Sequence, residues 1–312
     1  MKTLKIAVFA ACSMLFVTCK ESSIEKGEMA ANNSKLNLES KSLLMSLDNS
    51  PRLLANSSGK KVALYMAEFI TAGNGNELGR TVFFNNRGNK QLNADFVPGL
   101  FLDGTNNISY YVDNKRPSND LTSTVTENAI DRAMNTWDGV KCSNLGMTKV
   151  PFNNAISTGF VAAILGFPGS LTYTADVVHA GWMPAPFFDF LAPGGRNFIL
   201  GVTFTIIFID GDGNPLDSDN NNKLDVAFRE IYYNDNFGWN DGSTFDVETV
   251  ALHESGHGLS QAHFGTAFRS ANNKLHFSPR AVMNAAYSGV QTRIDQTDLA
   301  GHCSNWANWP NR

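Results

Sequence analysis

The chain has few cysteines, little excess charge and no apolar run long enough to cross a membrane. Two of its four cysteines, Cys12 and Cys19, lie in the first 19 residues, so the remaining two cannot make a disulfide-rich scaffold. The apolar stretch at residues 6–17 has twelve residues, too few to span a bilayer. With 25 basic and 29 acidic residues, the net charge of −4 offers no basic surface for nucleic acid. What is present, 312 residues of which 43% are hydrophobic, predicts a globular protein.

The most informative group of residues lies between positions 253 and 263. Three of the six histidines, His253, His257 and His263, follow an H-E-x-x-H pattern with a third histidine six residues later. On a helix, residues four apart share a face, so His253 and His257 can hold one zinc ion, and Glu254 can accept a proton from zinc-bound water. His263 would be the third ligand and leave the fourth position open, as a catalytic zinc requires. A solvated helix face carrying two histidines is the alternative, but three of six histidines in eleven residues favour zinc.

These residues resemble the signature of the metzincin zinc endopeptidases, H-E-x-x-H-x-x-G-x-x-H followed by a Met-turn. Met283 follows His263 by 20 residues (283 − 263), a separation similar to that of the matrixin branch. In that family the methionine lies beneath the zinc and does not bind it. Segments 126–137, 174–182 and 297–301 resemble the family's first helix, a central strand with its turn, and the start of the C-terminal helix.

The chain departs from the family pattern between the second and third histidines. The family's glycine is replaced by Ser260, which would cost about 1 kcal/mol if the position is left-handed. The neighbouring Gly258 is an alternative place for the turn. Ala285 stands where some branches have a tyrosine, and we expect Tyr287 to have a packing role. No cysteine-switch motif precedes the domain, so latency through a cysteine–zinc bond is not supported.

The resemblance covers roughly residues 100 to 312 and implies an α+β, metzincin-like zincin fold. Such a fold has a twisted mixed sheet, an active-site helix that binds zinc, and a C-terminal helix after the Met-turn. Apolar segments predict strands at 62–70, 81–84, 108–112, 198–208 and 226–233 and a helix at 126–138. The sequence from Ser243 to Asp246 resembles a capping box at the start of the zinc helix.

The N-terminus has the pattern of an export signal. Lys2 and Lys5 precede the apolar stretch, which ends just before Cys19 in a sequence similar to a relaxed bacterial lipobox. The following Lys20 and Glu21 resemble the export signal of Bacteroidetes-type surface lipoproteins. The resemblance implies lipidation of Cys19 and an outer-membrane protein at the cell surface or outside it. A plain secretory signal is the alternative.

We therefore expect four regions along the chain. Residues 1–18 are a lipoprotein signal peptide and 19–58 a polar tether. Residues 59–105 form an N-terminal β extension that is a candidate propeptide, and 106–312 form the metzincin-like catalytic domain.

An acidic loop is the second candidate metal site. Its carboxylates, spaced by glycine and asparagine, suit calcium, although the spacing does not match an EF-hand. An ordinary polar loop between two strands is the alternative. The candidate ligands are Asp210, Asp212, Asp217, Asp219 and Asp225.

Cys142 and Cys303 are the two cysteines left in the exported chain, and they predict either one disulfide or two buried thiols. We expect no functional role for the other histidines, which are isolated in the sequence: His179, His276 and His302.

The resemblance implies a zinc-dependent endopeptidase with Glu254 as general base and a protein or peptide substrate. The substrate would lie extended and pair with a sheet edge, which the sequence does not identify. Apolar Ala281, Ala285 and Ala286 suggest a roomy specificity pocket. We expect a monomer that contacts the membrane only through its lipid anchor and does not bind nucleic acid. The alternative is a catalytically inactive surface binding or adhesion protein, organised by zinc or calcium.

Overall fold

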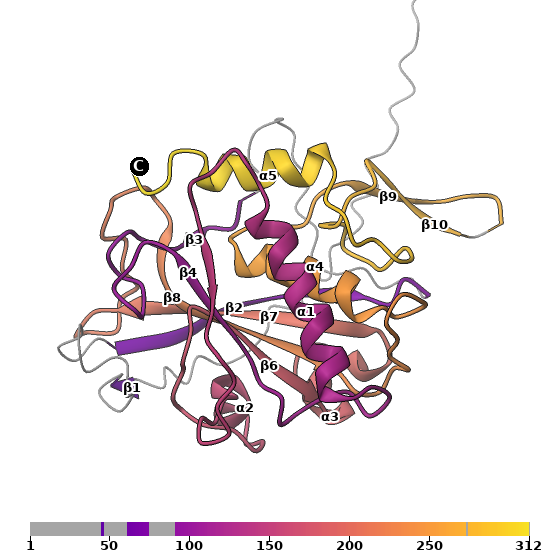
Figure 1. Cartoon of the computed structure of the whole chain (residues 1–312), viewed down its shortest axis with the longest axis horizontal. Coiled ribbons are helices and arrows are strands. Elements are labelled where there is room, and N and C mark those ends of the chain that lie inside the picture. Colours follow the sequence, from indigo (N-terminus) through magenta and orange to yellow (C-terminus); the bar gives the residue numbers. More distant parts are fainter. Residues whose placement is uncertain (1–44, 47–60, 75–90, 273, 312) are drawn as a thin grey trace, which may run out of the picture. The chain divides into compact units, whose positions relative to one another are not determined.

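The computed structural model describes residues 45–46, 61–74, 91–272 and 274–311. Their main feature is a mixed sheet with the strand order β1-β2-β7-β8-β6-β4-β5, to which β3 is added beside β8 (Figure 1). The bounds are Met45–Ser46 for β1, Lys61–Thr71 for β2, Ala94–Asp95 for β3, Ile108–Val112 for β4, Met147–Lys149 for β5, Val177–Met183 for β6, Ile199–Ile209 for β7 and Leu224–Asn234 for β8. A separate hairpin of β9 (Thr266–Arg269) and β10 (Leu275–Ser278) projects from the rest of the domain (Figure 1).

The sheet changes direction at β7. Strands β5, β4, β6 and β8 pair in parallel, whereas β7 is antiparallel to β8, and β2 is antiparallel to β7. β2 therefore covers the side of β7 that would otherwise be open. Strands β2 and β3 belong to the region expected as an N-terminal extension, and β1 to the expected tether, yet all three pair within this sheet.

Helices cover both faces of the sheet. Alternate strand residues enter different clusters: Val177 and Ile231 pack with α1 (Ser123–Asp138), α4 (Val247–Gly258) and α5 (Gln296–Trp306). Their neighbours Val178 and Tyr232 pack on the opposite face with α2 (Phe160–Ile164) and α3 (Ala185–Asp189). A short 3-10 helix, η3, spans Gly195–Asn197. Because both faces are buried, β6 and β7 contain no charged residue and do not alternate between buried and exposed positions.

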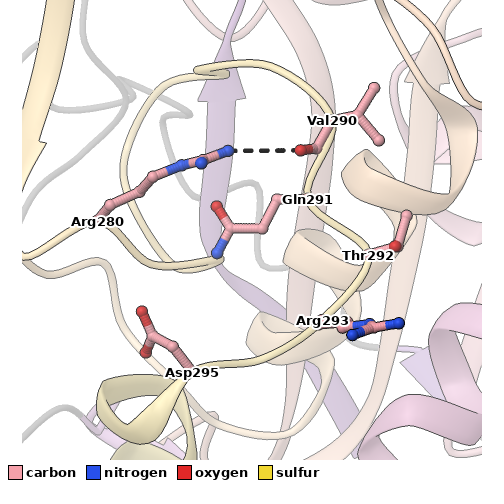
Figure 2. A pocket seen from close by; sticks show the side chains of 6 residues that line it. All are labelled: Arg280, Val290, Gln291, Thr292, Arg293 and Asp295. Atoms are coloured by element: carbon pink, nitrogen blue, oxygen red, sulfur yellow. Dashed lines mark hydrogen bonds between the residues drawn. The ribbon is translucent and has the colours of Figure 1, made fainter.

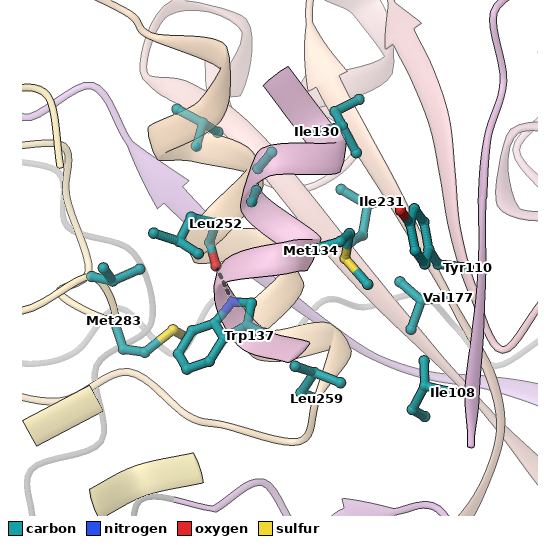
Figure 3. Packing of buried hydrophobic residues seen from close by; sticks show 14 of the residues in the cluster. Ile108, Tyr110, Ile130, Met134, Trp137, Val177, Ile231, Leu252, Leu259 and Met283 are labelled. Carbon is teal, nitrogen blue, oxygen red and sulfur yellow. Dashed lines mark hydrogen bonds between the residues drawn. The ribbon is translucent and has the colours of Figure 1, made fainter. Parts of the chain in front are cut away.

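The core beneath α1 positions helix α4. Ile130, Met134 and Trp137 of α1 point toward the sheet and α4 (Figure 3). The indole Nε1 of Trp137 donates a hydrogen bond of 2.9 Å to the Leu252 carbonyl on α4. This contact joins the first helix directly to the residue before His253.

A disulfide joins Cys142, just after α1, to Cys303 in α5, with a Cα–Cα distance of 5.8 Å. The bond indicates an extracytoplasmic protein, because disulfides persist in oxidising compartments. None of the helices within the described residues has the length and apolar character of a membrane span.

The α+β class, the mixed sheet and the C-terminal helix agree with the sequence predictions. The predicted helix at 126–138 begins three residues earlier, at Ser123, because Thr122 is its N-cap. The predicted strand at 81–84, the signal peptide and Cys19 lie outside the described residues.

Candidate metal centre

Helix α4 carries His253 and His257 one turn apart. Its N-cap is Asp246, whose carboxylate accepts a 2.7 Å hydrogen bond from the Thr249 amide. The predicted capping box starting at Ser243 is therefore wrong: the helix begins three residues later, and the aspartate, which accepts more strongly than a hydroxyl, takes the N-cap position.

The turn after α4 returns His263 to the helix. Gly258 remains helical, so it does not form the turn, and Ser260 adopts the left-handed conformation with φ 68°. The Ser260 hydroxyl accepts a 2.8 Å hydrogen bond from Arg229, which also donates to the Gly258 carbonyl at 3.0 Å. A buried guanidinium on β8 therefore holds this turn.

The three imidazoles meet at their Nε2 atoms. His253 Nε2 lies 3.0 Å from His263 Nε2 and 3.1 Å from His257 Nε2, and the third side of the triangle is 3.0 Å. Nitrogens bound to zinc at about 2.0–2.1 Å in a tetrahedron stand about 3.3 Å apart, close to these distances. All three side chains are at most 1% exposed.

Hydrogen bonds on the other ring nitrogens determine the tautomers of two histidines. Nδ1 of His253 lies 2.6 Å from the Val282 carbonyl, and Nδ1 of His257 lies 2.7 Å from the Gln261 carbonyl. A carbonyl only accepts, so each Nδ1 carries the proton and each neutral ring presents an Nε2 lone pair to the centre. His263 Nδ1 lies 3.7 Å from a carboxylate oxygen of Glu68 on β2.

Burial keeps the rings of His253 and His257 neutral. Desolvation lowers the pKa of His253 to about 4 and that of His257 well below its usual value. Their two Nε2 lone pairs, 3.1 Å apart, repel one another unless a cation lies between them. The three histidines therefore fit a metal ion such as zinc.

Met283 lies beside the histidines, in the turn that the sequence resemblance predicts. It is fully buried, and a Cβ added at Gly256 of α4 would meet its sulfur at 2.2 Å. The Asp298 carboxylate accepts hydrogen bonds from the amides of Val282 (3.0 Å) and Met283 (3.1 Å). Since the Val282 carbonyl orients His253, α5 supports the metal centre through Asp298.

Glu254 lies next to the first histidine and is completely buried. Its Oε2 accepts a 2.6 Å hydrogen bond from the Thr203 hydroxyl of β7, and its Oε1 accepts a 3.3 Å bond from the Ile70 amide of β2. Burial is the main reason that its pKa is raised to about 8.

A cavity beside His253 is lined on one side by Ile70 of β2. Val282, Ala286 and Tyr287 also line it, as does Ala281, whereas Ala285 does not. A larger surface hollow of about 400 Å³ lies on the loop before α5. Gln291 lines both this hollow and the cavity beside His253. Figure 2 shows the hollow with its residues Arg280, Val290, Gln291, Thr292, Arg293 and Asp295.

The acidic loop brings together only part of the predicted calcium site. Asp217, Asp219 and Asp225 each place a carboxylate oxygen within 4.8 Å of the others. Asp210 and Asp212 are outside this group, because Asp210 accepts hydrogen bonds from the amides of Asp212 and Asn214 in its own tight turn. The trio is a second candidate metal site.

The histidines without a predicted function have structural contacts. His179 forms a 2.8 Å hydrogen bond with the Tyr233 hydroxyl, and His276 forms a 3.0 Å hydrogen bond with the Ser270 hydroxyl. The His302 ring stacks on Trp137.

Sequence reasoning missed Glu68, Thr203, Arg229 and Asp298. Glu68 interrupts an apolar run of β2, and Arg229 stands with Glu230 between apolar residues of β8; charged residues inside predicted buried strands are the signal that could have identified them. Thr203 carries no such signal, because threonine is common in strands.

Comparison of the sequence with protein-family models and with curated proteins gives no match.

Proposed function

We propose that the protein is a zinc-dependent endopeptidase. The observation that carries the proposal is the convergence of three histidine Nε2 atoms beside a buried glutamate. A purely structural zinc site is normally closed by a fourth protein ligand, whereas three histidines leave one position for water. When bound there, zinc lowers the pKa of its water to about 7 and polarises a carbonyl group.

Glu254 acts as the general base in this proposal. It accepts a proton from the attacking water and passes it to the amine of the leaving chain. Support comes from the 3.3 Å distance between its Oε1 and a peptide nitrogen, that of Ile70, and from the Thr203 hydroxyl that orients the carboxylate. A pKa raised toward neutrality suits a group that must both take and return a proton.

The test compares wild type with Glu254→Gln for zinc content and casein hydrolysis. Because β2 lies over Glu254, both proteins are also assayed in an Ile70→Asp background. We expect one zinc in each protein and hydrolysis only where Glu254 is present, lost on addition of a chelator. Equal hydrolysis by the Glu254→Gln protein would refute the assigned base, and absence of zinc would refute the metal site.

We also propose that the protein is exported and anchored at the outer membrane through Cys19. The disulfide between Cys142 and Cys303 supports export. Labelled palmitate should enter the wild-type protein in a lipoprotein-producing bacterium but not a Cys19→Ser variant. Labelling of both proteins would contradict attachment at this cysteine.

A further inference from the structure

Strand β2 is bonded to the side of β7 that lies beside Glu254. It adds to β7 in antiparallel register, with Ile70 opposite Gly201 and Glu68 opposite Thr203. Strand addition to a sheet edge is a general way of binding peptides, since main-chain groups supply the hydrogen bonds. The edge of β7 beside Glu254 is therefore occupied by β2, a segment of the same chain.

The end of β2 is held from a second side. The Thr71 amide donates to the Ala285 carbonyl at 3.4 Å, and the Tyr287 amide donates to the Thr71 carbonyl at 2.8 Å. Thr71 and Ala286 form a parallel bridge. The chain therefore passes through a slot between β7 and the segment after Met283, bonded on both sides as an extended peptide would be.

The peptide nitrogen of Ile70 lies next to the proposed general base. The Ile70 amide donates to Glu254 Oε1 at 3.3 Å, and Ile70 and His253 line the same cavity. Ile70 is 2% exposed, and Glu254 and the three histidines are at most 1% exposed. An external peptide cannot reach these groups while the slot is filled.

Resting on the proposed peptidase function, we propose that β2 keeps the enzyme latent by occupying the substrate slot. Because β2 belongs to the same chain, its effective concentration at the slot is on the order of millimolar, so it outcompetes weakly bound external peptides. The site becomes accessible when the end of β2 leaves the slot, which requires the loss of the Ile70 contacts.

The test measures zinc loss to a chelator from the zinc-loaded protein, a readout that needs no activity. In Ile70→Asp, a charge replaces a buried apolar side chain at the wall of the cavity, so zinc should leave at least about tenfold faster than from wild type. Ile70→Ala should give an intermediate rate. The matched control is Tyr65→Asp, which places the same charge at a 36% exposed position of the same strand and should leave the rate unchanged.

A peptide of residues 61–72 provides the complementary test. Added to the Ile70→Asp protein, it should slow zinc loss, whereas the same peptide with aspartate at position 70 should not. Ile70→Asp should also hydrolyse casein at least about tenfold faster than wild type. Circular dichroism and thermal unfolding verify that each variant is folded.

Two failures can be told apart. If zinc leaves wild type, Ile70→Ala and Ile70→Asp at the same rate, β2 does not block the site and the latency proposal is wrong. If zinc loss accelerates as expected but no variant hydrolyses casein, β2 does cover the metal centre, while the peptidase function is wrong.

Discussion

The Ser260 hydroxyl accepts a hydrogen bond of 2.8 Å from the Arg229 guanidinium, and both residues are completely buried. Ser260 is left-handed (φ 68°) at the position where the resembling family has glycine. The hydrogen bond offsets a conformation that costs a serine about 1–2 kcal/mol. The departure from the family pattern is thus linked to a charged residue on a distant strand, and both act on the turn that returns His263 to α4.

Replacing Ser260 separates its two effects. Ser260→Ala loses the acceptor for Arg229 and keeps the left-handed conformation, so it should destabilise the fold by about 1–3 kcal/mol. Ser260→Gly also loses the acceptor but removes the strain, so it should be more stable than the alanine variant by about 1 kcal/mol. Urea unfolding of the three proteins measures both differences. A Ser260→Ala protein as stable as wild type would show that the hydrogen bond contributes nothing.

Asp298 should affect zinc binding although it touches no ligand. In Asp298→Ala, the amides of Val282 and Met283 lose their acceptor, and the Val282 carbonyl that orients His253 becomes less well positioned. We expect zinc affinity to fall by about 10–100-fold, as for other groups that orient metal ligands. Asp295→Ala is the control, since Asp295 caps the same helix without bonding the Met283 turn. Equal affinities for zinc in wild type and Asp298→Ala would disprove this role.

The disulfide should contribute strongly to stability. Cys142 and Cys303 are 161 residues apart, and cross-linking a loop of that length in the unfolded chain is worth up to about 5 kcal/mol. The Cys142→Ser/Cys303→Ser double variant should have a correspondingly lower free energy of unfolding in urea. A reductant should lower the stability of wild type and leave that of the double variant unchanged. If the reductant affects both proteins equally, the effect does not come from this bond.

His302 should make stability depend on pH. Burial lowers its pKa from 6.5 to about 4, so between these values the unfolded chain binds the proton and the folded chain does not. The free energy of unfolding is therefore unaffected by His302 above pH 6.5 and decreases as the pH falls toward 4. At pH 5 the decrease is about 2 kcal/mol. The His302→Phe variant keeps a ring against Trp137 and lacks the titration.

The measurement compares the zinc-free wild type with His302→Phe at pH 7 and pH 5. Asp176 and Asp298, whose pKa values burial raises to about 6, act in the opposite direction, but they do so in both proteins. Wild type should therefore lose about 2 kcal/mol more than the variant between these pH values. An identical loss in both proteins would mean that His302 does not titrate as burial predicts.

Local patterns predicted the parts of the site that depend on local geometry. The spacing of His253 and His257 places them on one helix face because the helical period is a property of the backbone. Apolar segments likewise located β2, β4, β7 and β8 to within a few residues, since a buried strand needs a continuous run of such side chains. The start of α4 was misplaced, because Ser243 and Asp246 are both plausible caps and local sequence does not decide between them.

The residues that can bind a metal ion, and the helix that presents two of them, are readable from the sequence, because both follow from side-chain chemistry and helical period. Long-range packing, in contrast, places Arg229 at the turn of Ser260 and Asp298 under the Met283 turn, and it gathers three of the five loop aspartates. The same packing puts β2 into the slot beside Glu254. These relationships join residues far apart in the chain, and their register depends on how the whole sheet is assembled, which no local pattern encodes.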